Sequence, residues 1–193
     1  TNAAGESKTF AGYMNGIGAD LFTPAANTSR AMMAQVLYNI ANGGGYTDDT
    51  VIVPSDEPGF KSFDDVATNM WYAEAVAWAK QAGIVTGYGD TGLFGPEDNV
   101  TREQFATMLF RFAKAYGVDT SVDVDAALAT MPDGDQVSEF AKEGVAWCVQ
   151  NKLMGNGGAI NPTAEIIRAE AAQMALNYAK FQELPYNGAD YEE

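Results

Sequence analysis

The sequence predicts an all-α fold: three helix–loop–helix repeats with pseudo-threefold symmetry around a central helical bundle. Three observations carry this prediction. One segment recurs three times along the 193 residues, its apolar residues keep a helical spacing, and glycine- and proline-rich loops separate its helices. At 47% apolar residues, the chain also has enough material to bury a real core.

The repeats keep proline and arginine in phase. The three copies read GADLFTPAANTSRAMMAQVLYNIA, GDTGLFGPEDNVTREQFATMLFRFA and GAINPTAEIIRAEAAQMALNYA. Upstream of the last two, EAVAWAKQAGIVTG and EGVAWCVQNKLMGN also correspond, pairing Trp78 with Trp147. A chance match would not keep two residue types in register across three copies. The positions held in phase are Pro24, Pro96 and Pro162, and Arg30, Arg102 and Arg168.

The second helix of each repeat carries an apolar stripe. In the second copy Phe105, Met108, Leu109 and Phe112 lie at i, i+3, i+4 and i+7, which is one helical face. The stripe indicates core rather than a ligand site. Because no single hairpin can bury its own apolar face, the three stripes are expected to meet around one axis. The equivalent stripes are Met33, Val36, Leu37 and Ile40, and Ala171, Met174, Ala175 and Tyr178.

Each of these helices has a recognisable start. Thr101 followed by Gln104 predicts a capping box, and Ser29 can cap the first copy. In the third copy Ile167 stands at the cap position, so the hydroxyl is missing. We expect Thr163 or another side chain to compensate, or that helix to fray.

The repeats and their linkers divide the chain. In the first repeat, Glu6 and Ala4 occupy the positions of Trp78 and Val76, so the first helix of that repeat lacks its large apolar residues and is incomplete. Another segment or a second chain would then complete it. The predicted boundaries are 1–45 for the first repeat, 46–60 for a linker, 61–117 for the second repeat, 118–130 for a linker, 131–182 for the third repeat and 183–193 for an acidic tail.

Composition excludes several classes of function. A net charge of −15 argues against partners that need a basic face, namely nucleic acid and anionic membrane surfaces. No apolar stretch is long enough for membrane insertion. The chain has no histidine, which removes histidine-based catalysis, and its one cysteine, Cys148, is expected to be a buried inert thiol. We therefore predict no enzyme and no cofactor.

Several pairs of aspartates are candidates for a metal-binding site. The pairs Asp48–Asp49, Asp64–Asp65 and Asp133–Asp135 could bind calcium, but no twelve-residue loop has the required ligand spacing. A solvated or capping role is favoured, and no metal site is predicted.

The second copy resembles a known family. FDDVATNMWYAEAVAWAKQAGIVTGYGDTGLFGPEDNVTREQ is similar to the S-layer homology repeat, whose pattern runs F-x-D-V, W-Y-x-x-A-V, G-I-V-x-G-Y-x-D, F-x-P and T-R-A-E. The third copy resembles a variant of it, and the first resembles the back half of a repeat. No copy carries a complete T-R-A-E motif, because the three read SRAM, TREQ and IRAE.

The resemblance implies a non-catalytic surface anchor outside the cell, on the cell wall or S-layer of Gram-positive and related bacteria. Triplets of this family have grooves between repeats that bind secondary cell-wall polymer, often through a terminal N-acetylmannosamine carrying a ketal-linked pyruvate. The partner it implies is thus a cell-wall polysaccharide, and the chain would belong to a larger surface protein. By position, the family's ligand-binding arginine is Arg30, Arg102 or Arg168.

The chemistry of arginine agrees with that role. Its planar fork pairs with a carboxylate, such as that of a pyruvate ketal, through two parallel hydrogen bonds. A cation in the first helical turn also opposes the helix dipole, which favours an anion nearby, and free amides at the same helix end would help to hold it. The alternative is an internal salt bridge, for instance to Glu74 or Glu143. If only one groove works, we expect it to use Arg102.

Three more side chains are candidates for the grooves. Trp71 and Tyr88 lie near the ends of elements and could equally stack on sugars or pack internally, whereas Trp78 and Trp147 are expected in the core. Thr101, in the same motif as Arg102, completes the predicted glycan-binding set. The alternative function is a protein–protein or surface-assembly module on the same scaffold without polymer binding.

Overall fold

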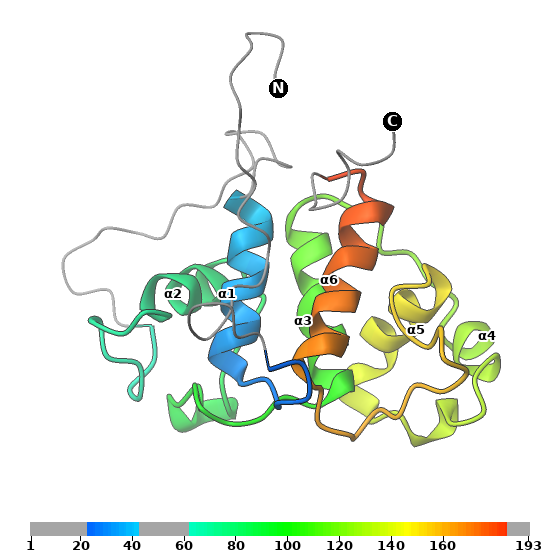
Figure 1. Cartoon of the computed structure of the whole chain (residues 1–193), viewed down its shortest axis with the longest axis horizontal. Coiled ribbons are helices and arrows are strands. Elements are labelled where there is room, and N and C mark those ends of the chain that lie inside the picture. Colours follow the sequence, from blue (N-terminus) through cyan, green and yellow to red (C-terminus); the bar gives the residue numbers. More distant parts are fainter. Residues whose placement is uncertain (1–22, 43–61, 185–193) are drawn as a thin grey trace, which may run out of the picture.

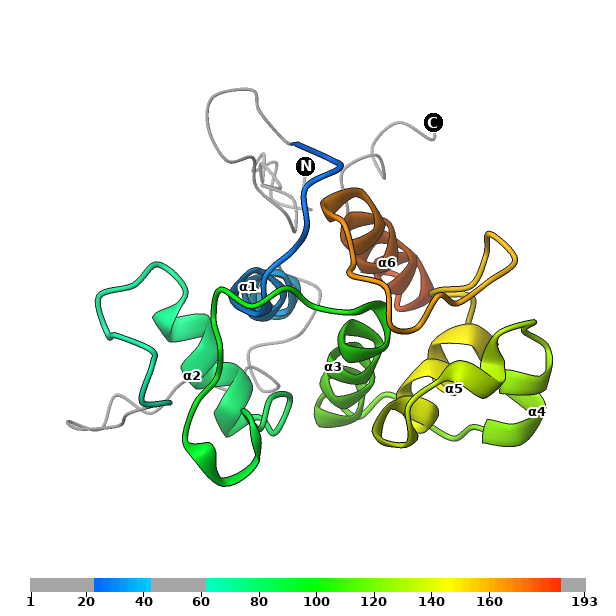
Figure 2. The same cartoon turned by 90° about the horizontal axis from the view of Figure 1, so that it is seen from below.

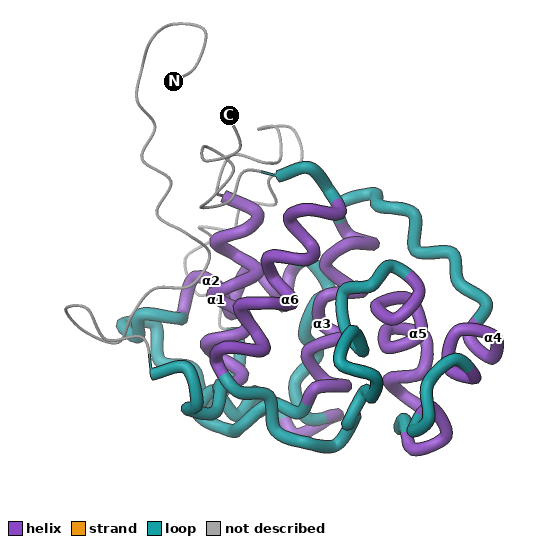
Figure 3. Tube along the Cα trace, turned by 45° about the vertical axis from the view of Figure 1, so that its right-hand side comes forward, coloured by secondary structure: helices purple, strands orange, loops and turns teal. Residues whose placement is uncertain are grey.

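The computed structural model describes residues 23–42 and 62–184. Within these ranges the chain is helical and contains no β-strand, which confirms the all-α prediction (Figure 3). Short 3₁₀ turns at Gly89–Thr91, Gly134–Gln136 and Glu139–Ala141 punctuate the loops. The α-helices are α1 (Arg30–Ile40), α2 (Ala73–Gln81), α3 (Arg102–Ala115), α4 (Val124–Ala129), α5 (Lys142–Gln150) and α6 (Arg168–Phe181).

Helices α1, α3 and α6 form the centre of the molecule. They rise side by side in Figure 1, and Figure 2 shows α1 end-on and α3 and α6 obliquely, with the other helices outside them. The three predicted apolar stripes lie on these helices, and every stripe residue is buried. Their burial confirms that the stripes belong to the hydrophobic core. Packing of the repeats together removes this apolar surface from water, which a single repeat could not do alone.

A closed ring of hydrogen bonds joins the segments that lead into the three central helices. The amide of Val100 donates to the carbonyl of Thr28 at 3.0 Å, that of Ile166 to Val100 at 2.8 Å, and that of Thr28 to Ile166 at 3.0 Å. These residues occupy the same position in the three repeats. The ring ties the helix starts together, while threefold symmetry of the whole arrangement stays a prediction.

The outer helices pack across the repeat boundaries. Helix α2 of the second repeat lies against α1 of the first, and α5 of the third lies against α3 of the second. Trp78 meets Tyr38 edge-on at 5.4 Å between ring centroids, and Trp147 meets Phe110 at 5.9 Å. Both tryptophans are fully buried, as predicted. Each of these outer helices is therefore packed against the neighbouring repeat.

The segment predicted as a linker at 118–130 contains helix α4. Asp123 caps this helix by accepting the Ala126 amide at 3.0 Å, and the buried Ala127 and Leu128 pack it toward α5. The predicted linker thus contains a helix that begins at an aspartate cap. The first helix predicted for the first repeat, the linker at 46–60, Asp48–Asp49 and residues 185–193 of the tail lie outside the described residues.

Helix α6 begins at Arg168 even though no hydroxyl caps it. The amides of Arg168 and Ala169 donate to the carbonyls of Ala26 and Pro24, at 2.8 and 3.0 Å. This contact with a neighbouring loop is common to the three central helices, so it does not stand in for the missing hydroxyl. The Glu170 carboxylate accepts the Ile167 amide at 3.2 Å, and the roles expected of Thr163 and of fraying stay predictions. The helix starts of α1 and α3 are held in the same way, so their first amides are not free to bind an anion, contrary to expectation.

Candidate functional site

Two of the repeated arginines make the same contact across a repeat boundary. Arg30 Nε donates to the carbonyl of Phe94 at 2.6 Å, and Arg102 Nε donates to the carbonyl of Ile160 at 2.6 Å. Phe94 and Ile160 belong to the glycine-rich loop of the next repeat. The arginine position thus joins one repeat to the loop of the following one.

Aspartates hold the loops that receive these arginines. The Asp65 carboxylate accepts the amides of Phe94 and Gly95 at 2.8 and 2.7 Å. The Asp133 carboxylate accepts the amides of Ile160 and Asn161, at distances between 2.7 and 3.1 Å. One aspartate of each of these two pairs thus holds a loop through its backbone amides, rather than capping a helix. The described residues contain no group of three or more side chains suited to a metal ion.

The pKa of Asp133 reflects this environment. Burial by itself raises that pKa, but hydrogen bonds from the backbone amides, helped by the charge of Arg102, outweigh burial and hold the pKa below its ordinary value. Asp133 is therefore ionised at neutral pH, and its charge fixes the loop against which Arg102 lies.

Arg30 lies between two aromatic rings. Its guanidinium carbon is 4.6 Å from the centre of the Tyr88 ring and 4.8 Å from that of Phe94, the geometry of cation–π contacts. Burial lowers the pKa of Arg30, and the nearby Tyr88, Asp98 and Asp65 oppose that effect. Asp98 itself accepts the Tyr88 hydroxyl at 2.8 Å. Among the described residues, no carboxylate forms an ion pair with Arg30.

A hollow of about 490 Å³ opens beside this arginine, and we call it the Arg30 pocket. Its second cation is Arg111 on α3, and the ring of Phe140, 59% exposed, stands at its edge. The lining residues that the structure describes include no carboxylate. They are Arg30, residues 84–89, Gln104, Thr107, Met108, Arg111 and Phe140.

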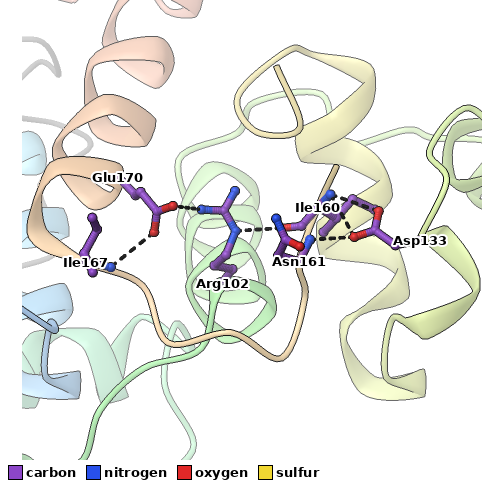
Figure 4. A network of polar contacts seen from close by, with 6 residues as sticks. All are labelled: Arg102, Asp133, Ile160, Asn161, Ile167 and Glu170. Carbon is purple, nitrogen blue, oxygen red and sulfur yellow. Dashed lines mark hydrogen bonds and ion pairs between the residues drawn. The ribbon is translucent and has the colours of Figure 1, made fainter. Parts of the chain in front are cut away.

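A second hollow, of about 290 Å³, occupies the equivalent place one repeat later, and we call it the Arg102 pocket. Here Arg102 pairs with Glu170 at 2.7 Å between Nη1 and Oε1 (Figure 4). The internal salt bridge considered from the sequence is therefore present at this arginine, with Glu170 rather than Glu74 or Glu143. The described lining is Arg102, residues 153–157, Ala159, Asn161, Glu170, Gln173, Met174 and Asn177.

The remaining predicted site residues are spread more widely. Tyr88 lines the Arg30 pocket beneath the guanidinium. Thr101 accepts the Gln104 amide at 3.3 Å in the predicted capping box and lines neither pocket. Trp71 is 59% exposed, contacts Tyr72 edge-on and also lines neither pocket. Arg168 contacts Met32 Sδ at 3.7 Å, and the loop that corresponds to its partner lies at residues outside the described ranges.

Sequence reasoning did not select Phe140 or Arg111 for the site. A signal existed for Phe140, because it is the counterpart of Trp71 when Trp147 is aligned with Trp78. Arg111 carried no such signal, since its equivalent in the third repeat is Asn177. Cys148 is buried, as expected, and burial raises the pKa of its thiol, so it supplies no reactive thiolate.

Comparison with known protein families identifies the repeats. Residues 62–106 and 130–172 match the S-layer homology domain. These two segments contain α2, α5, the loops held by Asp65 and Asp133, and the starts of α3 and α6. The chain thus belongs to the S-layer homology family.

Several relatives of the chain are named as S-layer or anchoring proteins. An S-layer protein of Bacillus licheniformis is 32% identical over 162 residues, covering 83% of this chain and 16% of the relative. S-layer protein EA1 of Bacillus anthracis is 30% identical, covering 83% and 17%. The cellulosome-anchoring protein of Acetivibrio thermocellus is 26% identical, covering 96% and 39%.

This chain therefore spans less than two-fifths of the length of these relatives. Family and relatives together indicate an anchoring module at the cell surface. None of the helices in the described ranges has the length and apolar character needed to cross a membrane.

Proposed function

We propose that the chain anchors a larger protein to the bacterial cell wall by binding secondary cell-wall polymer in the Arg30 pocket. The ligand group is the carboxylate of a pyruvylated, N-acetylmannosamine-type sugar. The proposal rests on the contacts of Arg30. Its Nε donates a hydrogen bond to the Phe94 carbonyl, and none of the carboxylates of the described residues forms an ion pair with its guanidinium. A ligand carboxylate would complete its hydrogen bonding.

The rest of the pocket suits a charged sugar. Arg111 adds a second positive charge to a described lining without carboxylates. Phe140 offers an exposed ring on which a sugar face can stack, and Tyr88 holds Arg30 from the other side. This arrangement favours the Arg30 pocket over the Arg102 pocket, which was the one expected from the sequence.

Calorimetric titration with pyruvylated cell-wall polymer tests the proposal. Wild type is compared with Arg30→Ala and, as the matched change one repeat later, Arg102→Ala. Arg30→Ala is expected to weaken binding at least about tenfold, since a hydrogen bond to a charged group is worth roughly 1.5–3 kcal/mol. Polymer stripped of pyruvate serves as the ligand control, and circular dichroism shows that each variant is folded.

Two results would count against the proposal. A loss confined to Arg102→Ala would move the site to the other pocket. No binding by folded wild type would remove the polymer as ligand and favour the surface-assembly module instead.

A further inference from the structure

Glu103, in the first turn of α3, is a buried acid that the proposed site does not use. The residue is only 4% exposed. The Ser138 amide donates to its Oε2 at 2.9 Å, and the Ser138 hydroxyl donates to its Oε1 at 2.7 Å. Among the residues that the structure describes, neither oxygen has another partner. The second repeat thus commits both oxygens of a carboxylate to one residue of the third.

The scaffold does not require an acid at this position. The equivalent residues of the other two repeats are Ala31 and Ala169. Helices α1 and α6 begin normally with alanine there, and α1 still packs against α2. An acid in a first turn suits the helix dipole, but that effect needs neither burial nor a contact with Ser138. Burying an acid is unfavourable unless hydrogen bonds compensate, so the contact with Ser138 is what requires a reason.

Ser138 begins the short turn that carries Phe140. It precedes the 3₁₀ turn Glu139–Ala141, and its hydroxyl donates to Glu103 instead of capping that turn. Ala141, at the end of the turn, is fully buried, whereas the Phe140 ring is 59% exposed at the edge of the Arg30 pocket. Packing does not hold a ring that is so exposed. Its position over the pocket therefore depends on how firmly the backbone of the turn is fixed.

We propose that Glu103 is a positioning residue for ligand binding: through Ser138 it holds Phe140 over the Arg30 pocket without itself touching the sugar. The inference rests on the proposed function, in which the Phe140 ring stacks on the ligand. A turn that is already ordered in the free protein does not have to be ordered when the ligand binds, and this lowers the cost of binding. Glu103 supplies that order from the second repeat to a ring of the third.

Two substitutions at Glu103 separate positioning from packing. Glu103→Ala copies the residue of the other two repeats and removes both acceptors. Glu103→Gln is the conservative rescue, because its side chain can still accept the Ser138 amide and can donate to the Ser138 hydroxyl. Circular dichroism shows that each variant is folded. If Glu103→Ala fails to fold, Ser138→Ala, which removes the hydroxyl donor alone, takes its place with the same expected direction.

Two measurements are made on each protein. Calorimetry gives the affinity for the methyl glycoside of N-acetylmannosamine with ketal-linked pyruvate. Amide hydrogen exchange, followed by NMR without ligand, reports how firmly Ser138 is held. We expect Glu103→Ala to exchange faster at Ser138 and to lose about two- to tenfold in affinity, the cost of ordering the turn on binding. Glu103→Gln should stay near wild type in both.

A double-mutant cycle with Phe140→Ala shows whether Glu103 acts through the ring. Once the ring is absent, Glu103→Ala should cause no further loss of affinity. An equal loss with and without the ring would make Glu103 a structural residue and overturn the inference. Unchanged affinity or unchanged Ser138 exchange in Glu103→Ala would also overturn it, and would leave the proposed function intact. No binding by folded wild type would overturn the proposed function and this inference together.

Discussion

Thr28, one of the three residues of the hydrogen-bonded ring, carries a buried hydroxyl. Its backbone takes part in the ring, but its Oγ1 has no hydrogen-bond partner and the residue is fully buried. The equivalent residues in the other repeats are Val100 and Ile166, which are apolar and also fully buried. Leaving a hydroxyl unpaired in such a place costs free energy, so this residue is locally unfavourable.

Thr28→Val should therefore stabilise the protein. Valine has nearly the shape of threonine and matches the residue used one repeat later, so the change removes the unpaired hydroxyl and leaves the packing in place. We expect the free energy of unfolding to rise by about 1 kcal/mol, measured by urea denaturation. Thr107→Val is the control, because the Thr107 hydroxyl donates to the Glu103 carbonyl at 2.8 Å. A loss of stability in Thr28→Val would contradict the prediction.

At the scale of elements, the approach of α5 to α3 depends on the absence of a side chain at Gly144. A Cβ there would lie 2.9 Å from the Cα of Thr107 and 3.2 Å from the carbonyl oxygen of Ala106. Both neighbours are backbone atoms of α3, so the helix as a whole would have to move. This contact joins the third repeat to the second, and Phe140 at the edge of the Arg30 pocket lies just before α5.

Gly144→Ala is expected to destabilise the protein by about 1–3 kcal/mol, because overpacking against backbone outweighs the better helix propensity of alanine. Thermal and urea unfolding measure the change. Gly157→Ala is the matched control, since a Cβ at Gly157 would meet nothing within 4 Å. Equal stability of wild type and Gly144→Ala would show that α5 can shift without cost.

At the scale of the whole molecule, charge opposes the proposed ligand. The chain carries −15 at neutral pH, while the proposed polymer is also anionic. Long-range repulsion slows the encounter, and the local arginines act only after the two are close. Salt screens the long-range part first, since the Debye length falls from about 30 Å at 0.01 M salt to about 8 Å at 0.15 M.

The association rate constant for the polymer should therefore increase as salt is raised over that range. Stopped-flow mixing or surface plasmon resonance measures it, with polymer stripped of pyruvate as the less charged comparison. A rate that falls with added salt would mean that local attraction already governs the encounter.

The sequence alone was sufficient to predict the helical repeats, their apolar stripes and the arginine position, because all of these are periodic. Helical spacing places Phe105 and Phe112 on one face whatever surrounds them, and the recurrence of Arg30 and Arg102 marks them without a structure. The capping box at Thr101 is equally local, since both partners lie within one helical turn.

Only the tertiary structure decided which helices pair, what accepts the first amides of the central helices and which arginine meets an acid. The carbonyl of Ala26 in the first repeat caps α6 in the third, and Glu170 reaches Arg102 from the next repeat. Sequence patterns carry no information about contacts between segments so far apart in the chain. The difference between the two pockets depends on such contacts. The sequence repeat places an arginine at the same position in each pocket. The charge beside each arginine depends on which side chain from another repeat the fold brings next to it.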